Sequence, residues 1–319
     1  MNVESLAPEE GTCKTQCVRV NGVPTHLMKV EPNSAETKEV ADESDVLFLV
    51  IPGNPGIVDF YEVFMLTLFK ASGCKVPVWG ISHAGHTSLT QKLDDNAQGP
   101  YSLVDQIDHK AAFIRDFVPP GKRLVLIGHS IGCHIILQVM KSNPSLPILK
   151  AVLLFPTIER MWDSPNGTFL APLLCYFRWL AVFGVFLSSY LSDWVKWRAI
   201  NWFFRGRKVP PCTFHAALNL FNPSCTNNII FMAAHEMREV VEPDLDAIAQ
   251  HLPKLLFYYG AKDGWCPVDY YYDIKKLFPE GDIRLCKRGI AHAFCLESSE
   301  LMADLTWNWL GQDIQIQVN

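Results

Sequence analysis

The sequence predicts an α/β protein with a mostly parallel central sheet flanked by helices. Two observations carry this prediction. Continuous apolar runs of strand length, such as 46–51 and 254–260, alternate with amphipathic segments of helical length, such as 102–118, and this order is typical of βαβ units. The alternation stops near residue 157 and resumes near 252, which indicates a large insertion in the repeated pattern.

Each element of the first half follows from its residue pattern. The polar residues 1–14 are expected to be disordered. Residues 15–30 predict a hairpin, because Asn21-Gly22 favours a tight turn between two strand patterns. A helix at 102–118 stops at Pro119-Pro120. The other predicted elements are a polar loop at 31–44, strands at 46–51, 76–81 and 148–155, a helix at 58–71, and a strand and helix joined at 128–132.

The second half completes the sheet after the insertion. Predicted strands at 254–260 and 282–286 alternate with helices at 267–278 and 299–310, and residues 313–319 form a tail. The core therefore comprises 15–156 and 253–312, and the hydrophobic helical insertion at 157–252 follows the sixth strand. In this architecture an insertion at that point covers the carboxyl edge of the sheet as a cap, and sites in open α/β sheets lie at this edge.

The composition excludes several classes of function. The 319 residues have a net charge of −5 and 49% hydrophobic residues, with nine tryptophans and nineteen phenylalanines. This chain lacks the basic footprint of a nucleic-acid-binding protein, and its apolar content indicates an apolar ligand or surface. Its ten cysteines show neither closely spaced zinc-type pairs nor a disulfide framework. The first eleven residues do not resemble a signal peptide. We expect reduced thiols facing the cytosol, no metal and no nucleic-acid partner.

The stretch Gly128-His-Ser130-Ile-Gly132 predicts a nucleophile elbow. It follows an apolar strand and leads directly into an apolar helix, which is the context that exposes a serine hydroxyl on a sharp turn. Glycine at positions 128 and 132 allows the strand and helix to approach closely. The alternative is a tight βα turn in which Ser130 has no chemical role.

A serine hydroxyl needs a base and an acid that orients the base. Asp263 and His292 follow the last two predicted strands, in the chain order serine, acid, histidine that α/β-hydrolases show. Asp163 and Asp269 are rival acids, but the first lies in the cap and the second on a helix. Three other histidines are expected to line the site or to be structural, namely His83, His86 and His129.

The oxyanion of the tetrahedral intermediate needs backbone donors. The residue after the nucleophile, Ile131, supplies one N–H. The second is expected from the loop Pro52-Gly-Asn-Pro-Gly56, in which neither proline can donate. Asn54 is the first candidate and Gly53 the second.

The cap contains a segment, 169–204, that is expected to embed in a membrane. Residues 169–191 are apolar apart from Arg178, and Pro172 is expected to interrupt a continuous helix. We expect the two uncharged halves on either side of Arg178, 164–177 and 179–192, with Phe183, Phe186 and Leu187, to enter one leaflet as a hairpin. An aromatic and basic girdle suited to headgroups follows, with Trp194, Trp197 and Trp202. The alternative is a hydrophobic cap that packs on the core or forms an apolar tunnel.

These segments together resemble the lipid droplet-associated hydrolase family of the α/β-hydrolase superfamily. The resemblance extends over residues 15–311 and rests on Pro52–Gly56, the elbow, Gly260-Ala-Lys-Asp263-Gly-Trp and His292-Ala-Phe294. It implies a serine lipid hydrolase of lipid droplets and endoplasmic reticulum, with sterol ester hydrolysis as its activity.

The leading hypothesis is therefore a serine ester hydrolase that acts on neutral lipid esters, cholesteryl esters among them. It would act at the cytosolic face of the lipid droplet monolayer or the endoplasmic reticulum membrane. No metal or organic cofactor is needed for the expected Ser130, Asp263 and His292 triad. The alternatives are a droplet coat or scaffold protein with an idle site, and an acyltransferase on the same fold.

Overall fold

The computed structural model describes residues 11–32, 44–86 and 99–315 of the chain. Within these residues a single sheet has the strand order β1-β2-β4-β3-β5-β6-β7-β8. The hairpin of β1 and β2 joins β4 antiparallel, whereas all the following neighbours pair parallel. The strands are β1 (Gly11–Val20), β2 (Val23–Pro32), β3 (Val46–Ile51), β4 (Val78–Ile81), β5 (Arg123–His129), β6 (Ile148–Leu154), β7 (Leu255–Gly260) and β8 (Asp282–Cys286). The predicted fold class is confirmed.

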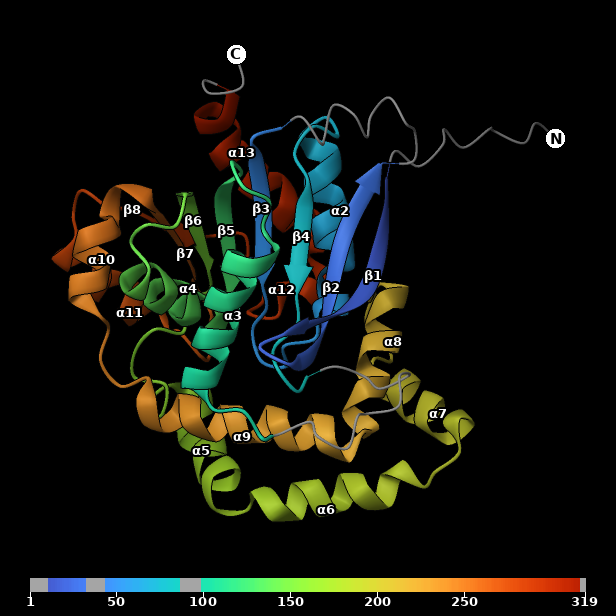
Figure 1. The fold of residues 1–319 in the computed structure, drawn as a ribbon. Helices are drawn as coiled ribbons and strands as arrows, with labels where there is room; N and C mark the ends of the chain where they lie inside the picture. Colours follow the sequence, from blue (N-terminus) through green and yellow to red (C-terminus); the bar gives the residue numbers. More distant parts are fainter. Residues whose placement is uncertain (1–10, 33–43, 87–98, 316–319) are drawn as a thin grey trace.

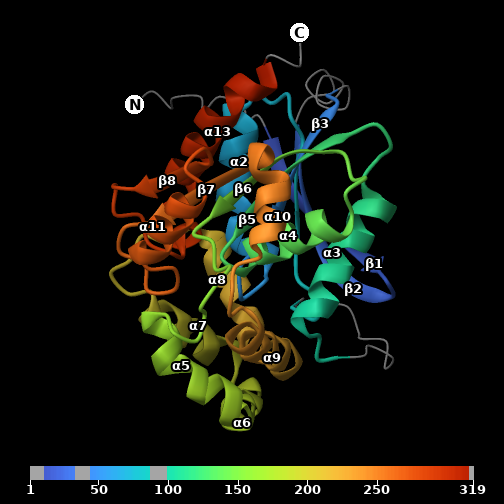
Figure 2. The same ribbon diagram turned by 90° about the vertical axis from the view of Figure 1, so that its left-hand side faces the viewer.

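The apolar runs in the sequence are explained by the position of the central strands. Every residue of β3 and of β7 is buried, because helices cover both faces of these central strands. α2 and α13 pack together on one face, and α3, α4 and α10 lie on the other (Figures 1 and 2). The core helices are α2 (Glu62–Ala71), α3 (Leu103–Phe117), α4 (Ile131–Ser142), α10 (Leu245–His251), α11 (Val268–Leu277), α12 (Phe294–Glu297) and α13 (Ser299–Gln315), with short 3-10 turns η1 (Val58–Tyr61) and η3 (Leu252–Lys254).

The start of α3 shows how local sequence determines a boundary. The Ser102 hydroxyl accepts the N–H of Asp105 at 3.2 Å, and the Asp105 carboxylate accepts the N–H of Ser102 at 2.7 Å. This reciprocal pair is a capping box, which satisfies two backbone donors that a helix start leaves without partners. The helix therefore begins where the predicted segment begins.

The insertion forms a separate helical layer at one end of the sheet (Figure 1). Its first two helices, α5 and α6, pack on the long helix α9. The inserted elements are α5 (Pro165–Tyr176), α6 (Arg178–Ser189), α7 (Asp193–Phe203), α8 (Pro211–Leu218), η2 (Asn219–Phe221) and α9 (Pro223–Glu239).

Three predicted boundaries differ in the structure. The prediction of disorder for 1–14 is wrong for residues 11–14, because Gly11 already pairs with Pro32 in the hairpin. α10, which falls in the predicted insertion 157–252, packs on the core helix α4, where Asp244 accepts hydrogen bonds from Gln138 at 3.0 Å and from Lys141 at 2.6 Å. α13 continues to Gln315, beyond the predicted start of the tail. Residues 1–10, 33–43 and 316–319 lie outside the described residues.

The apolar segment of the cap bends next to Arg178, between the two expected halves, and not at Pro172. Pro172 lies inside α5, and the helix ends instead at Phe177, whose φ of −116° and ψ of 20° leave the helical region. Within the described residues no single helix is long and apolar enough to cross a membrane. α5 and α6 meet that criterion only as a pair, and they are bent by 76° at the break between them. Because α6 packs along α9, the two helices do not form a free hairpin.

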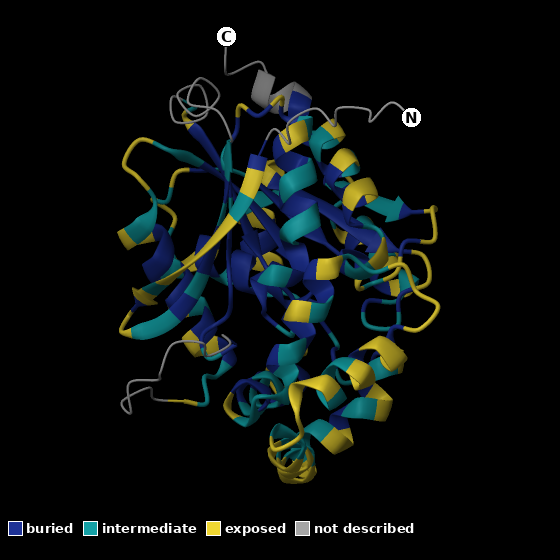
Figure 3. Ribbon diagram, turned by 90° about the vertical axis from the view of Figure 1, so that its right-hand side faces the viewer, coloured by how far each residue is buried: buried dark blue, intermediate teal, exposed yellow. Residues whose placement is uncertain are grey.

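Exposed apolar side chains gather on the outer side of the cap. Figure 3 shows many exposed residues on the cap helices, below a sheet that is largely buried. We call this surface the apolar face; its exposed side chains are Phe169, Leu173, Tyr176, Phe177, Trp179, Leu180, Phe183, Phe186, Leu187, Tyr190, Leu191, Trp194, Trp202 and Phe203.

The candidate membrane residues fall into two groups. Phe183, Phe186, Leu187, Trp194 and Trp202 are exposed on the apolar face. Trp197 differs from these residues because it is half-buried. Its ring stacks on that of Phe214 with an interplanar angle of 22°, so it helps to hold α7 against α8.

Candidate active site

The elbow connects β5 to α4 through a strained residue. Ser130 has φ 54° and ψ −123°, a conformation that costs an L-residue free energy and is typical of functional turns. A Cβ at position 132 would lie 2.3 Å from the carbonyl oxygen of Ile51, and one at 128 would lie 2.9 Å from the backbone nitrogen of Cys133. Only glycine allows these close approaches, and the result is that Ser130 lies at the carboxyl edge of the sheet.

The structure brings the three sequence-predicted side chains together at this edge. Asp263 follows β7, and His292 follows β8. His292 Nδ1 lies 2.7 Å from Asp263 Oδ2, and His292 Nε2 lies 2.9 Å from Ser130 Oγ. With the proton on Nδ1 donated to the carboxylate, Nε2 is free to accept the serine proton. This arrangement can activate a serine hydroxyl as a nucleophile.

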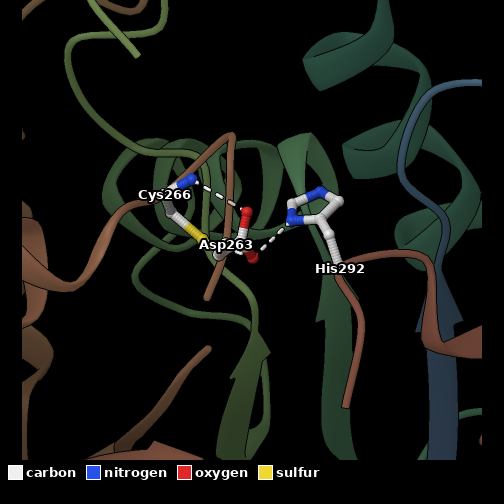
Figure 4. Close-up of side chains that lie close together, drawn as sticks. All are labelled: Asp263, Cys266 and His292. Carbon is white, nitrogen blue, oxygen red and sulfur yellow. Dashed lines mark hydrogen bonds and ion pairs between the residues drawn. The ribbon is translucent and has the colours of Figure 1, made fainter. Parts of the chain in front are cut away.

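Asp263 has further partners that sequence reasoning missed. Its Oδ1 accepts the N–H of Trp265 at 2.7 Å, and its Oδ2 accepts the thiol of Cys266 at 3.2 Å. Figure 4 shows Cys266 and His292 on either side of the carboxylate. Burial alone would raise the pKa of Asp263, but the hydrogen bond and charge of His292, together with these donors, hold it below its ordinary value. The acid is therefore ionised and held in one orientation.

Asp263, Cys266 and His292 could also be considered as metal ligands, because their ligand atoms lie within 4.8 Å of one another. The chemistry of the donors favours a hydrogen-bonded cluster instead. Burial and the adjacent Asp263 charge raise the pKa of Cys266 well above its ordinary value, so the thiol keeps its proton and donates it to the carboxylate. A thiolate would be needed to bind a metal.

His129 has a structural role beside the nucleophile. The Gly53 N–H donates to the Tyr61 hydroxyl at 2.9 Å, and that hydroxyl lies 2.6 Å from His129 Nδ1. His129 Nε2 lies 2.8 Å from the carbonyl oxygen of His292. Burial, with the nearby His292, lowers the pKa of His129 to about 3, so the ring is neutral. Tyr61 then donates to Nδ1, and the Nε2 proton is donated to His292, so His129 links the elbow to two neighbouring loops.

The same bonds separate the two candidates for the second oxyanion donor. The N–H of Gly53 is already used by Tyr61. Among the described residues no acceptor takes the N–H of Asn54. Ile131 is the first residue of α4, where N–H groups have no intrahelical partner. Asn54 and Ile131 are thus the available pair.

The rival residues lie elsewhere. Asp163 is exposed in the cap, and Asp269 is exposed on α11. His83 and His86 are buried against the loop that carries Asn54, where His86 Nδ1 accepts the N–H of Gly56 at 2.9 Å. Burial and the nearby Lys110 lower the pKa of His86 to about 3, so it is a neutral structural residue.

Ser130 and His292 line an apolar cavity of about 630 Å³. Its core wall includes Gly53, Asn54, Ser130 and His292. Its other walls come from the cap, with lining residues on α5, α6, α7, η2 and α9. Helices of the inserted segment therefore form much of the wall around the candidate site.

One buried acid in this cavity was not predicted from the sequence. Glu236 of α9 is 4% exposed, and its Oε1 accepts the Asn54 side-chain N–H at 2.9 Å. Burial raises its pKa to about 8, although the Asn54 bond opposes the shift. Glu236 is therefore a neutral carboxylic acid at pH 7. A charged residue in a helical sequence gives no signal of this kind, because burial is decided by the packed cap.

A serine on a strand-turn-helix elbow, beneath a helical insertion, belongs to the architecture of the α/β-hydrolases. Solved structures of this fold align with nearly the whole chain. One of them, a membrane phospholipase A described as a bacterial virulence factor, aligns with a TM-score of 0.60 and 17% identity over 95% of this chain and 87% of that structure. A likeness at this identity shows the fold.

The chain belongs to the lipid droplet-associated hydrolase family. Residues 44–295 match the family model described as lipid-droplet associated hydrolase. The lipid droplet-associated hydrolase of Gallus gallus is 41% identical over 321 residues, covering 98% of this chain and 99% of that protein. The Homo sapiens protein of the same name is 42% identical over 325 residues, with the same coverage.

Proposed function

We propose that the protein is a serine ester hydrolase that acts on neutral lipid esters, cholesteryl esters among them. One observation carries the proposal. His292 lies 2.7 Å from the Asp263 carboxylate and 2.9 Å from the Ser130 hydroxyl, at the wall of an apolar cavity. These three groups can activate the serine for attack on an ester without moving from the positions described.

The reaction follows from this geometry. Ser130 Oγ attacks the ester carbonyl while His292 Nε2 takes its proton, and Asp263 stabilises the imidazolium that forms. The N–H groups of Asn54 and Ile131 bind the oxyanion. His292 returns the proton to the departing alcohol, which leaves an acyl group on Ser130. Water then attacks this acyl-enzyme with His292 again acting as base, and the carboxylic acid is released.

The cavity favours a neutral, apolar substrate. Among the described residues its lining includes no lysine, arginine or aspartate, so it lacks the permanently charged groups that bind a phosphate or a free carboxylate. Glu236 is neutral at pH 7, since burial raises its pKa to about 8. The names of the relatives associate those proteins with lipid droplets, whose contents are neutral lipids.

The apolar face would dock the protein on the droplet monolayer or on the endoplasmic reticulum, from the cytosolic side. Exposed apolar patches of this kind mark interaction or membrane surfaces. Arg178 lies at the break between α5 and α6, with its guanidinium 4.9 Å from the Phe231 ring centroid. Within the described residues it has no ion-pair partner, and it is suited to the headgroup layer.

Covalent labelling with a fluorophosphonate probe tests the enzyme proposal directly. We expect wild type to be labelled and to hydrolyse cholesteryl oleate in emulsion, whereas Ser130→Ala does neither. Absence of labelling in folded wild type would exclude the proposed nucleophile and favour a droplet coat protein.

A further inference from the structure

The loop that carries the proposed oxyanion donor is bonded to the cap. Asn54 Nδ2 donates to the Ile229 carbonyl oxygen at 3.0 Å and to Glu236 Oε1 at 2.9 Å. Both acceptors belong to α9, which lies more than 170 residues further along the chain. A cap helix therefore holds a residue of the core loop, next to the nucleophile.

We propose that Glu236 is a positioning residue that fixes Asn54 for oxyanion binding and so makes turnover depend on the place of α9. The inference rests on the serine hydrolase function proposed above. It assigns a role in the reaction to a side chain of the cap that need not touch the reacting ester.

The other bonds of this loop show why the cap matters. Gly53, one residue before Asn54, is held from the core by the Tyr61 hydroxyl at 2.9 Å. Within the part of the chain that the structure describes, the Asn54 side chain has no such core partner, because its Oδ1 is buried without a hydrogen bond and its Nδ2 bonds only α9. If α9 moves, Gly53 keeps its partner and Asn54 loses both of its own. Small displacements of an oxyanion donor have large effects on rate.

The protonation state of Glu236 favours the bonded arrangement. Burial raises the pKa of Glu236 to about 8, so at neutral pH a neutral acid occupies the apolar wall. Its shift has only two causes, burial and the Asn54 bond. Several elements with titratable or charged groups face α9. Among the described residues these groups are Cys175 of α5, Arg178 of α6, His86 and Tyr101 near Asn228, Asp105 and Asp108 of α3, and Tyr61, His129, His292 and Cys295 across the cavity.

Ionisation of Glu236 would remove this arrangement. None of these neighbours compensates a carboxylate at this position, so above pH 8 an uncompensated charge is buried. Movement of α9 and entry of water relieve that cost and release Asn54. α5 and α6, which form part of the apolar face, pack on α9. Docking of the apolar face and positioning of Asn54 therefore both involve α9.

The test measures kcat and KM for a short, soluble p-nitrophenyl ester from pH 6 to 9.5. Glu236→Leu removes the acceptor, and we expect kcat to fall roughly 10–100-fold with little change in KM. Glu236→Gln keeps the acceptor oxygen without a titratable proton and should restore kcat to within about threefold. Wild-type kcat should decline as the pH passes about 8, and this decline should be absent in Glu236→Gln. Glu239→Leu, on an exposed position of the same helix, is the control and should behave as wild type.

Asn54→Ala keeps the backbone N–H and removes the same bond from the loop side, so it tests the idea even when Glu236→Leu fails to fold. Its kcat should fall by a similar factor, and the double variant should lose little more than the larger single change. Suppose that wild type is active and labelled, but that the kcat values of Glu236→Leu and Asn54→Ala equal that of Glu239→Leu. This result would overturn the inference and leave the proposed function intact. A fall of kcat at alkaline pH in Glu236→Gln as well as in wild type would do the same. A wild type that is neither labelled nor active would overturn the proposed function itself.

Discussion

Both oxygens of Asp263 are occupied in the candidate site. Oδ1 accepts two backbone N–H groups, from Trp265 and Cys266, while Oδ2 accepts from His292 Nδ1 and from the Cys266 thiol. A carboxylate with four donors cannot rotate without losing several of them. Its orientation therefore selects the imidazole tautomer that leaves Nε2 facing Ser130.

Asp263→Asn should lower ester hydrolysis by roughly 10⁴, because an amide in this place favours the wrong imidazole tautomer. Folding should be retained, as the Oδ1 bonds remain possible. The measurement is kcat/KM on a soluble ester, with Asp163→Asn and Asp269→Asn as charge-matched controls at exposed positions. Loss of activity in Asp163→Asn with full activity in Asp263→Asn would show that the acid is misassigned.

Glu236→Gln should stabilise the protein increasingly as the pH rises. Burial raises the pKa of Glu236 from 4.5 to about 8. Between these two pH values the folded state therefore keeps a proton that the unfolded state has already released. Stability therefore falls as the pH rises through this window, at about 1.4 kcal/mol per pH unit. We expect similar melting temperatures for the two proteins at pH 4.5 and a variant that melts about 5 °C or more higher at pH 9. Parallel melting curves across this range would contradict the assigned shift.

Ser130, Asp263 and His292 could be predicted from the sequence because each lies just after a recognisable strand and their order along the chain is informative. Glu236 and Cys266 could not. The bond of Glu236 joins residues 182 positions apart, and its neutral state depends on burial by helices whose packing no local pattern shows. Cys266 gives no signal because a lone cysteine near an acid is common.

At the scale of elements, position 132 at the junction of β5 and α4 should not tolerate a side chain. Gly132→Ala would place a Cβ 2.3 Å from the Ile51 oxygen and 2.6 Å from the Pro52 oxygen, both in backbone that neighbouring strands hold. We expect destabilisation of about 3 kcal/mol, measured by urea unfolding. Gly184→Ala in α6 is the matched control, because its Cβ would meet nothing within 4 Å and should stabilise that helix by about 0.5–1 kcal/mol. Equal effects at the two positions would refute the packing argument.

The apolar face makes a prediction about docking. Phe183→Ser, Phe186→Ser and Leu187→Ser together remove half-exposed apolar side chains from α6 and should lower partition onto phospholipid-coated triacylglycerol droplets roughly 100-fold. Labelling of Ser130 by a soluble probe should persist. Serine at Tyr272, Leu277 and Leu301, which are also exposed but lie on core helices, serves as control. Droplet binding that survives the α6 changes would move the docking surface elsewhere.

Elements with a local cause were predictable, and elements that depend on tertiary contacts were not. The hairpin at Asn21-Gly22 and the capped start of α3 follow from a few adjacent residues. The expected interruption at Pro172 does not occur, because a proline inside a helix removes one donor without ending the helix. The chain turns instead at Phe177, between the two expected halves, where both helices pack on α9. The half-burial of Trp197 was missed for the same reason, since its partner Phe214 lies on another helix.

At the scale of the whole molecule, the ten cysteines should all be thiols. None is paired in the structure, where Cys17 is exposed, Cys13 and Cys175 are half-buried and the others are buried. Ellman's reagent should count ten thiols in guanidinium without reductant and no more than three before unfolding. Cys13 should react slowly, because burial raises its pKa to about 12. A total of eight or fewer under denaturing conditions would show a disulfide.

The cap helices face two ways. Leu174 of α5, Val185 of α6 and Ile200 of α7 line the cavity, while other residues of the same helices form the apolar face. These helices would therefore separate a docked lipid layer from the cavity that contains Ser130. An ester that crosses this layer of helices never dissolves in water. The substrate concentration that matters is then the mole fraction of ester in the surface layer. At a constant bulk amount of ester, the rate should rise with this mole fraction and then reach a plateau. Dilution of the droplet lipid with an inert ether, at fixed total ester, should slow the reaction.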